Sequence, residues 1–448
     1  MRILIVGAGA VGFHLAKKLA EENHDVTIVE ENRSRIKRIR ERLDVKALEG
    51  SGGSPEVLRN AGMAESDLVI AVTDRDEMNV IVCTVAKNLG VPRTIARVRN
   101  AEYSHESSLL DRQALGVDCI VNPVEITVES IAKIIQTPGA TEVADFADGE
   151  ILLRGFQVNE DSMVAGKRLS QFRLGASRDA FLIVAIVRGE EVIIPKGKDE
   201  IRAGDEIYVL VAREYLESVA GMIQRRSESK PSVVLYDSGE LTMRLARRIA
   251  KEVDQLVVVE PDQARAEMAC ARLPRGLVLC GEPTEAEILK EARVRDAGFF
   301  MGLSDRDDRN LLSALFAKKH GARRTMVLTN EPDFVPVISS IGIDVAINPR
   351  LLTVGEILRY VIRGNVLSVV SLREDQAEAL ELVAESGSKI VGKKLSQLKM
   401  PRGSLIGAIH RDGAMLIPSG ESVVRSGESV IVFTLTSAIE RVERLFTG

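Results

Sequence analysis

The sequence predicts an α/β protein with two doubly wound, Rossmann-like parallel-sheet domains, each followed by a small α+β domain. Three observations predict this fold. An apolar run leads into the glycine turn Gly7-Ala8-Gly9-Ala10-Val11-Gly12 and then into a helix-forming stretch. Strand and helix patterns then alternate to about residue 123, as in a parallel sheet with helical crossovers. Finally, the second half of the chain repeats the order of the first.

The glycine turn predicts a site for a nucleotide. Gly7 permits the tight turn, Gly9 lets a pyrophosphate approach the backbone, and Gly12 lets the following helix sit close to the sheet. At Ala10 and Val11 the helix N-terminus offers N–H groups and about half a positive charge to an anion. The alternative is a glycine turn that serves only tight packing.

The position of an acidic residue favours nucleotide binding over a purely structural turn. Glu30 ends the strand pattern of residues 25–29 and lies eighteen residues beyond Gly12. A dinucleotide-binding unit needs an acid there to accept the ribose hydroxyls. Because an acid at that position disfavours a 2′-phosphate, NAD is expected rather than NADP.

Two arginines predict a contact with phosphate. Arg97 and Arg99 lie two apart on a predicted strand, so their side chains project to one side. The crevice at the carboxyl ends of the strands is where ligands bind in such sheets, and guanidinium groups suit phosphate oxygens. The alternative is ion pairing with Asp74 or Asp76 at a subunit contact.

Two smaller side chains complete the predicted site. Thr73 follows the central apolar run of residues 68–72 and is expected to line the same crevice; its alternative role is a helix N-cap beside Asp76. Ser51 follows the third strand and is expected near the adenine end of the ligand. A plain loop turn at Ser51 is the alternative.

The other elements of the first domain follow from periodicity and punctuation. Ile36, Ile39 and Leu43 share one face of a basic helix. Pro55 stands at a first helical turn. Residues 68–72 are apolar on both faces, which is typical of a central parallel strand. The remaining predicted strands are residues 46–49, 94–98 and 119–121, and the remaining helices are residues 77–89, 106–115 and 124–136.

After residue 139 the pattern changes to short strands and turns, which predicts a small α+β domain. Its predicted strands are residues 151–158, 181–187, 191–194 and 206–211. Residues 225–231 are polar and lack apolar periodicity, so we expect a linker there.

The chain beyond this linker repeats the chain before it. Glu260 follows its strand as Glu30 does, residues 304–307 repeat residues 73–76, and residues 392–397 match residues 166–171. The predicted domains are residues 1–136, 137–226, 231–365 and 366–448.

The second copy of the turn has lost features that favour phosphate. Asp237 stands where a phosphate would approach, and only the middle glycine, Gly239, is kept. Where the first copy has Arg97-Val98-Arg99, the sequence pairing gives Val327-Leu328-Thr329 in the second.

Composition excludes several classes of protein. The 448 residues suggest two to four domains, at roughly 100–200 residues each. With 60 Lys and Arg against 65 Asp and Glu, no Trp and 4% aromatic residues, the chain shows no nucleic-acid surface. No apolar run approaches the ~18 residues that would span a bilayer, and the N-terminal run is too short for a signal peptide. A cytoplasmic location is expected.

No catalytic or metal site is expected. The four cysteines lack C-x-x-C spacing and are predicted to be buried, reduced thiols; they are Cys83, Cys119, Cys270 and Cys280. The five histidines show no spacing for metal binding or for a general base. No Tyr is followed four positions later by Lys, so the sequence shows no partner for hydride transfer.

Taken together, these motifs resemble the regulatory subunits of Trk potassium uptake systems, of the TrkA type, whose halves are regulators of potassium conductance (RCK domains). The features that carry the resemblance are the tandem domain order, the glycine turn, Glu30, Thr73-Asp74, Arg97-Val98-Arg99 and the exit at Asn122-Pro123. It covers nearly the whole chain. It implies a cytoplasmic regulator, peripheral on the inner face of the cell membrane, that responds to NAD(H) and to ATP or ADP. It also implies a homotetramer assembled on a membrane potassium-translocating subunit of the TrkH type.

The resemblance also carries over site residues: Gly7, Gly9, Gly12, Glu30, Arg97 and Arg99. Ser51 departs from the aspartate common in this family, and the second turn is expected to bind weakly or not at all. The alternative function is an NAD-dependent oxidoreductase with the small domains as substrate domains. A redox-sensing transcription factor would need a basic recognition helix, which the sequence does not offer.

Overall fold

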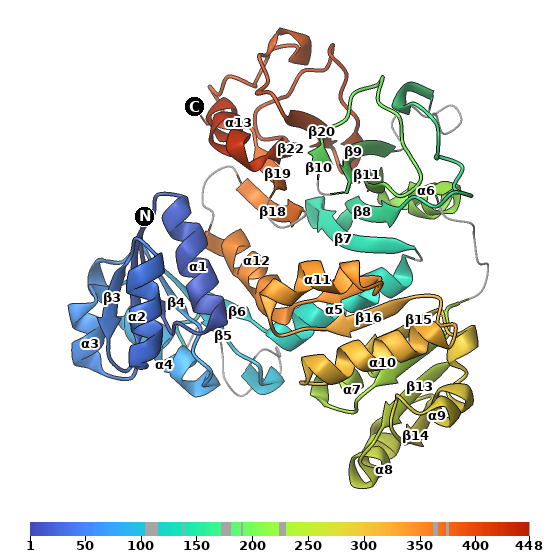
Figure 1. Cartoon of the computed structure of the whole chain (residues 1–448). Coiled ribbons are helices and arrows are strands. Elements are labelled where there is room, and N and C mark those ends of the chain that lie inside the picture. Colours follow the sequence, from blue (N-terminus) through green and yellow to red (C-terminus); the bar gives the residue numbers. More distant parts are fainter. Residues whose placement is uncertain are drawn as a thin grey trace.

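The computed structural model describes residues 1–103, 115–137, 139–171, 181–189, 191–223, 230–361, 366–372 and 376–447. It contains two parallel six-stranded sheets and two antiparallel five-stranded sheets (Figure 1). The predicted fold, two Rossmann-like domains each followed by a small α+β domain, is confirmed. Most of the helix expected at residues 106–115, and most of the linker expected at residues 225–231, lie outside the described residues.

The first parallel sheet has the strand order β3-β2-β1-β4-β5-β6 of a doubly wound nucleotide-binding fold. Its strands are β1 (Arg2–Val6), β2 (Asp25–Glu30), β3 (Lys46–Glu49), β4 (Leu68–Ala71), β5 (Arg93–Arg97) and β6 (Cys119–Val121). Its helices are α1 (Ala10–Glu21), α2 (Arg33–Arg42), α3 (Pro55–Asn60), α4 (Asp76–Asn88) and α5 (Pro123–Gln136). Every residue of the central strand β4 is buried, as its apolar run predicted.

The second parallel sheet repeats this order as β14-β13-β12-β15-β16-β17. Its strands are β12 (Val233–Tyr236), β13 (Leu256–Glu260), β14 (Leu277–Cys280), β15 (Phe299–Gly302), β16 (Thr325–Leu328) and β17 (Val345–Ile347). Its helices are α7 (Glu240–Ile249), α8 (Gln263–Arg272), α9 (Ala286–Glu291), α10 (Asp307–Lys319), α11 (Val335–Ser340) and α12 (Pro349–Val361).

Helices begin at the residues that local chemistry favours. Pro55 and Pro123 take first helical positions, where the missing N–H costs nothing. The side chain of Asn122 caps α5 by accepting the N–H groups of Val124 and Glu125. The sequence signals for these two helix starts are therefore confirmed.

In the residues that the structure describes, each small domain consists of an antiparallel sheet and one α-helix. The first holds β7 (Ala140–Phe146), β8 (Ile151–Gln157), β9 (Phe181–Arg188), β10 (Glu191–Ile193), β11 (Glu206–Ala212) and α6 (Leu216–Ile223). The second holds β18 (Val366–Leu372), β19 (Ala377–Val383), β20 (Ser404–Arg411), β21 (Ala414–Leu416), β22 (Ser429–Leu435) and α13 (Ile439–Phe446). The sequence analysis missed β7, an edge strand whose middle residues are all half-buried, so that no apolar alternation marks it.

The last helix of each Rossmann unit packs on the sheet of the other half. By sequence α5 belongs to the first half, yet its apolar side chains lie in one core with β12 and α7. These side chains are Val128, Ile131, Ala132, Ile134 and Ile135. In return, α12 of the second half buries Val354, Ile357 and Val361 against β1 and α1. The two halves thus complete each other's cores.

Two arginines fasten the exchanged helices. Arg93, which begins β5, donates from Nη1 to the carbonyl of Tyr360 at 2.8 Å, near the end of α12. Arg324, just before β16, donates from Nη2 to the carbonyl of Ala140 at 2.6 Å, beyond the end of α5. The same position in each half therefore holds the helix that the other half contributes.

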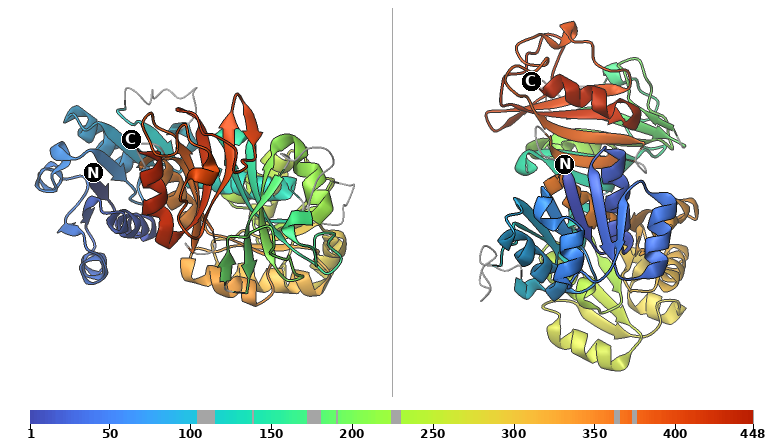
Figure 2. Two further views of the ribbon diagram at one scale, coloured as in Figure 1. Left: turned by 90° about the horizontal axis from the view of Figure 1, so that it is seen from above. Right: turned by 90° about the vertical axis from the view of Figure 1, so that its left-hand side faces the viewer.

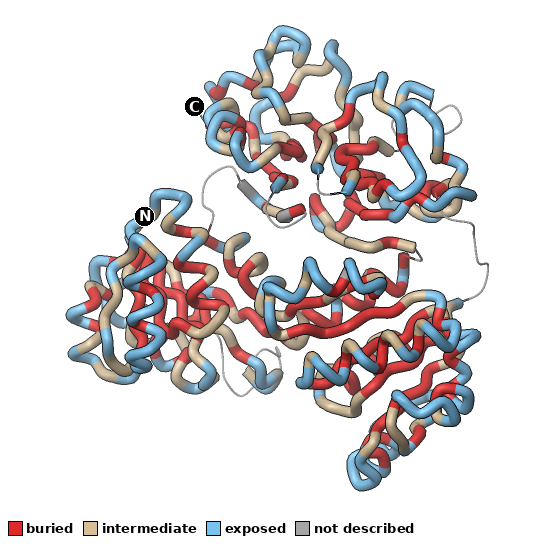
Figure 3. Tube along the Cα trace, in the orientation of Figure 1, coloured by how far each residue is buried: buried red, intermediate tan, exposed pale blue. Residues whose placement is uncertain are grey.

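The two small sheets pack face to face and share one core. Phe146, Tyr208 and Leu210 of the first sheet belong to the same core as Ala379 and Phe433 of the second. The small domains lie side by side above the helices α5 and α12, and the Rossmann domains lie below (Figures 1 and 2). Buried residues run through the sheets and the inner faces of the helices, and exposed residues gather on the outer helices (Figure 3).

The prediction of four buried cysteines is wrong for two of them. Cys83 and Cys119 are buried, whereas Cys270 and Cys280 are exposed. Cys280 is exposed because it ends β14, the edge strand of the second sheet, and Cys270 lies on α8 outside the face that buries Ala266 and Ala269. Among the described residues, no helix combines the length and the apolar character needed to cross a membrane.

Replacing Ile357 by Ala should destabilise the first half of the protein, although Ile357 belongs to the second half by sequence. The cavity left in the core around β1 and α1 is expected to cost about 2–5 kcal/mol. Thermal unfolding should show a lower Tm, and amide hydrogen exchange should rise in β1. Leu351→Ala on the same helix, where the side chain is 40% exposed, is the matched control. If protection from hydrogen exchange were lost only in the second sheet, the packing of α12 on the first sheet would be contradicted.

Candidate functional site

The glycine turn joins β1 to α1 at the carboxyl end of the first sheet. Gly7 has φ +103°, and a Cβ there would lie 2.9 Å from the backbone nitrogen of Thr73. A Cβ on Gly12 would lie 1.9 Å from the carbonyl oxygen of Gly7, so α1 meets the turn with no room for a side chain. Both distances agree with the structural roles given to these glycines.

The middle glycine faces open space. Gly9 is the N-cap of α1, and no atom lies within 4 Å of a Cβ built on it. No side chain in the described part of the chain caps this helix. Ala10 and Val11 are its first residues, so their N–H groups lie at an end of the helix dipole that attracts anions. Contact between this surface and a ligand remains a prediction.

Glu30 holds the turn in place. Its carboxylate is 5% exposed, and its oxygens accept the N–H of Ala8 at 2.7 Å and the N–H of Asn32 at 2.9 Å. Arg35 approaches the same carboxylate at 3.5 Å. Carboxylate oxygens have further lone pairs, so the role predicted for Glu30 at a ribose stays open beside the structural one.

Thr73 and Arg97 come together around a residue that the sequence analysis missed. The carboxamide of Asn79, fully buried in α4, accepts the N–H and hydroxyl of Thr73 and donates to the carbonyls of Thr73 and Arg97. Arg97 Nη1 donates to the carbonyl of Thr73 at 3.2 Å. Asn310 makes the matching bonds in the second half, so the repeat itself was the signal. Thr73 is not the N-cap of α4, because Arg75 takes that position.

Arg99 lies beyond the end of β5, so the two arginines do not share one strand. Its Nη2 donates to the carbonyl of Asp74 at 2.5 Å, and its Nε lies 3.9 Å from the carboxylate of Asp76. Burial lowers the pKa of Arg97, and the charges of Arg99 and of Arg350 from α12 lower it further. Among the described residues, the buried Nε of Arg97 has no hydrogen-bond partner.

Ser51 lies in the loop that follows β3. Its hydroxyl accepts the N–H of Gly53 at 3.3 Å, which is a local turn contact. Contact with an adenine remains a prediction.

The second turn has the backbone conformation of the first at its first residue but carries different side chains. Asp237 has φ +91°, close to the φ of Gly7, and its carboxylate accepts the N–H of Gly239. Arg265 donates to this carboxylate at 2.6 Å and lies 3.1 Å from Glu260. Burial opposes the charge of Arg265, but its hydrogen bond to Asp237 and the surrounding carboxylates more than offset that and raise its pKa.

The structure corrects the pairing of the two strands by one residue. Asn79 donates to the carbonyl of Arg97, and Asn310 donates to that of Leu328. Likewise, Asp76 accepts the N–H of Arg99, and Asp307 accepts that of Asn330. The equivalents of Arg97 and Arg99 are therefore Leu328 and Asn330, because one extra residue lies between Glu260 and Ser304. Neither replacement is cationic.

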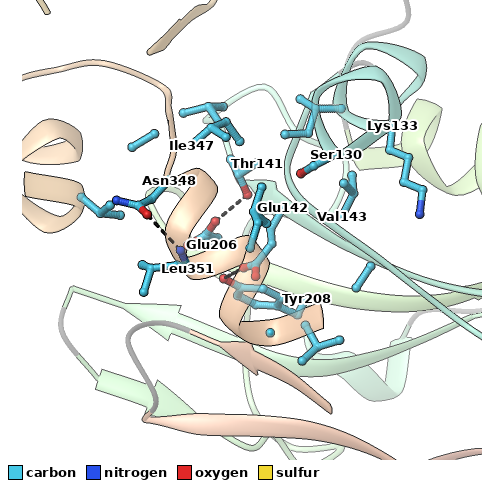
Figure 4. Close-up of a pocket in the computed structure, with 18 of the residues that line it drawn as sticks. Ser130, Lys133, Thr141, Glu142, Val143, Glu206, Tyr208, Ile347, Asn348 and Leu351 are labelled. Atoms are coloured by element: carbon cyan, nitrogen blue, oxygen red, sulfur yellow. Dashed lines mark hydrogen bonds between the residues drawn. The ribbon is translucent and has the colours of Figure 1, made fainter. Parts of the chain in front are cut away.

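A cleft of about 1570 Å³ separates the small domains from the helices below them. Its walls come from α1, α5 and α12 and from β7, β11 and β18. Figure 4 shows Tyr208 donating to Glu142, at 2.7 Å, and Thr141 donating to Glu206, at 2.5 Å. The helix that begins at the glycine turn thus forms part of this cleft from His14 onward.

Comparisons with known proteins agree with this architecture. Residues 3–123 and 233–349 match the TrkA-N domain, and residues 153–223 and 379–447 match the TrkA-C domain. The Trk system potassium uptake protein TrkA of Halomonas elongata is 35% identical, over 100% of this chain and 98% of that protein. The chain belongs to the TrkA family. The TrkA of Haemophilus influenzae is 32% identical, again over 100% of this chain and 98% of its own. The predicted resemblance is confirmed.

Solved structures show the same fold. The GsuK channel has a TM-score of 0.63 at 16% identity, covering 99% of this chain and 78% of that one. The GsuK RCK domain has a TM-score of 0.61 at 16% identity and covers 99% of this chain and 94% of its own. A third structure, of the GsuK channel bound to NAD, has a TM-score of 0.61. At 16% identity, the similarity between this chain and the GsuK structures shows a shared fold.

Proposed function

We propose that this chain is a nucleotide-sensing regulatory subunit of a potassium uptake system. It binds NAD(H) and ATP or ADP at the first glycine turn and gates a membrane potassium-translocating subunit of the TrkH type. The observation that carries the proposal is the contrast between two turns whose first residues have the same backbone conformation. At Gly9 the first is open to an anion, whereas the second holds the carboxylate of Asp237.

The charges around the first turn support a phosphate ligand. Arg97 and Arg99 extend over the β4–α4 loop, and the buried Nε of Arg97 lacks a partner among the described residues. A phosphate would satisfy such a donor and accept the N–H groups of the uncapped helix. NAD is bound by a protein of the same fold, the GsuK channel, which is in keeping with this assignment.

The site offers little to an enzyme. Glu30 and Thr73 are bonded to backbone groups that shape the turn and the β4–α4 loop, so they act as structural groups there. The competing function, an NAD-dependent oxidoreductase, predicts that NADH is consumed. A regulator predicts that each nucleotide is released unchanged.

A path from turn to cleft supports gating. Helix α1 begins at the glycine turn, lines the cleft with His14, Lys17 and Lys18, and packs against α12 of the second half. Nucleotides of different phosphate charge shift the domains only if they bind one arrangement better than another. The affinity difference between the two arrangements then sets the upper limit of the coupling free energy to the membrane subunit.

Exposed apolar side chains support association between copies of the chain, which we propose to be a homotetramer, peripheral on the inner face of the membrane. Ile81 on α4 is 54% exposed and Leu312, at the equivalent position on α10, is 52% exposed. Phe316, one turn beyond Leu312, is 40% exposed. Contiguous exposed apolar groups mark interaction sites, and their presence at the same position of both halves fits contacts between copies of one chain.

Gly9→Ala should weaken nucleotide binding and leave the fold intact. The new methyl group meets no protein atom, and Gly9 already has φ −61°, which alanine adopts freely. It would instead hold a phosphate away from the N–H groups, weakening ATP, ADP and NAD by about tenfold or more. Isothermal titration calorimetry measures the affinity.

Gly355→Ala in α12, where a Cβ also meets no atom, is the matched control and should bind as the parent does. Unchanged affinity in Gly9→Ala would contradict the site. Recovery of oxidised cofactor after incubation with NADH would favour the oxidoreductase instead.

Leu312→Asp should break the assembly of copies. The parent is expected to have a mass of about four times 48.9 kDa by light scattering, and the variant a lower one. The control is Met268→Asp on α8, because Met268 is 53% exposed but its first-half equivalent is Arg38. A parent mass of one chain would contradict the homotetramer.

A further inference from the structure

The two turns correspond residue by residue at a spacing of 230. Asp237 corresponds to Gly7, Gly239 to Gly9, Glu260 to Glu30 and Arg265 to Arg35; these pairs follow from the common positions on β1 and β12, β2 and β13, and α2 and α8. Both first positions have positive φ, +103° and +91°. The backbone frame is therefore the same, and the difference lies in what occupies it.

In the second turn the occupant is a side chain of the protein itself. One oxygen of the Asp237 carboxylate accepts the N–H of Gly239, the N-cap of α7. The other accepts from Arg265 at 2.6 Å. The Asp237 side chain is only 14% exposed. An anion at a helix N-terminus with a guanidinium across from it is the arrangement that a bound phosphate would show.

In the first turn that anion is missing. Gly7 has no side chain, and the Arg35 side chain, which is 54% exposed, has Glu30 at 3.5 Å as its one ion-pair partner among the described residues. In the second turn the guanidinium lies between two carboxylates, those of Asp237 and Glu260. In the first turn, within the part of the chain that the structure describes, one carboxylate lies beside the Arg35 guanidinium, which therefore still has capacity for a second anion.

We propose that the Asp237 carboxylate takes the place of a nucleotide phosphate in the second turn, and that Arg35 binds the phosphate in the first turn as Arg265 binds Asp237. The part that concerns Arg35 rests on the proposed function of the first turn. In the second turn a nucleotide phosphate would be repelled by the negative charge of Asp237. It would also find Leu328 and Asn330 in place of Arg97 and Arg99.

Calorimetry on the full-length chain tests Arg35. Arg35→Gln should weaken ADP and ATP by about tenfold or more, since a charge-assisted contact is lost. Arg33→Gln on the same helix removes an equal charge whose partner is Glu49 on the surface, and should leave the affinity unchanged. Equal loss in both variants, or no loss in Arg35→Gln, would overturn the assignment of Arg35.

Stoichiometry tests Asp237. The parent should bind one ADP per chain, and Asp237→Gly should bind a second, weaker equivalent of ADP or of inorganic pyrophosphate. Glycine is at ease at φ +91°, so this variant should fold. Asp237→Asn removes only the charge and should also admit pyrophosphate. One equivalent in both variants would overturn the internal phosphate substitute.

The outcomes separate this inference from the proposed function. If the parent binds no nucleotide, the proposed function fails and the role of Arg35 fails with it. A pyrophosphate site gained in Asp237→Gly would still support the substitution in the second turn.

Discussion

The structure depends on the reciprocal burial of α5 and α12. Each helix covers the sheet of the half to which it does not belong, and Ile131 and Ile357 are fully buried there. Burying one such side chain is worth roughly 1.5–3 kcal/mol, and several act together on each helix. Neither half completes its own core. Helix α1, which begins at the first glycine turn, therefore shares its core with a helix of the second half.

The two halves contain turns whose first residues both have positive φ, and in the first turn Gly9 faces open space. Glu30 and Glu260 bond to the turn in the same way, and Asn79 and Asn310 fix the neighbouring loop alike. These bonds satisfy buried polar groups, so the fold needs them in both halves. The first position of the turn differs between the halves. It is Gly7 in the first half, where Gly9 faces open space, and Asp237 in the second, where the carboxylate accepts the N–H of Gly239.

Much of the fold was predictable from the sequence, because strand and helix periods and glycine spacing are local signals. The helix face of α5 was predicted as apolar, but amphipathicity says that a face is buried and not against which sheet. Strand β7 escaped because Thr141 and Glu142 interrupt its apolar pattern. Asn79 escaped because one polar residue in a helix carries no signal until the repeats are compared. The pairing of Arg97 with Val327 was wrong by one residue because it kept the spacing of 230 that relates Glu30 to Glu260, whereas residues 304–307 already lie 231 positions beyond residues 73–76.

The proposed control of potassium flux by nucleotides can be measured after reconstitution. The chain is added to proteoliposomes that contain a TrkH-type subunit, and potassium uptake is measured with ATP, ADP, NAD or NADH. We expect the uptake rate to depend on the nucleotide with the parent chain and to become independent of it with Gly9→Ala. If the uptake rate with the parent chain were the same under all four nucleotides, gating by nucleotide would be contradicted.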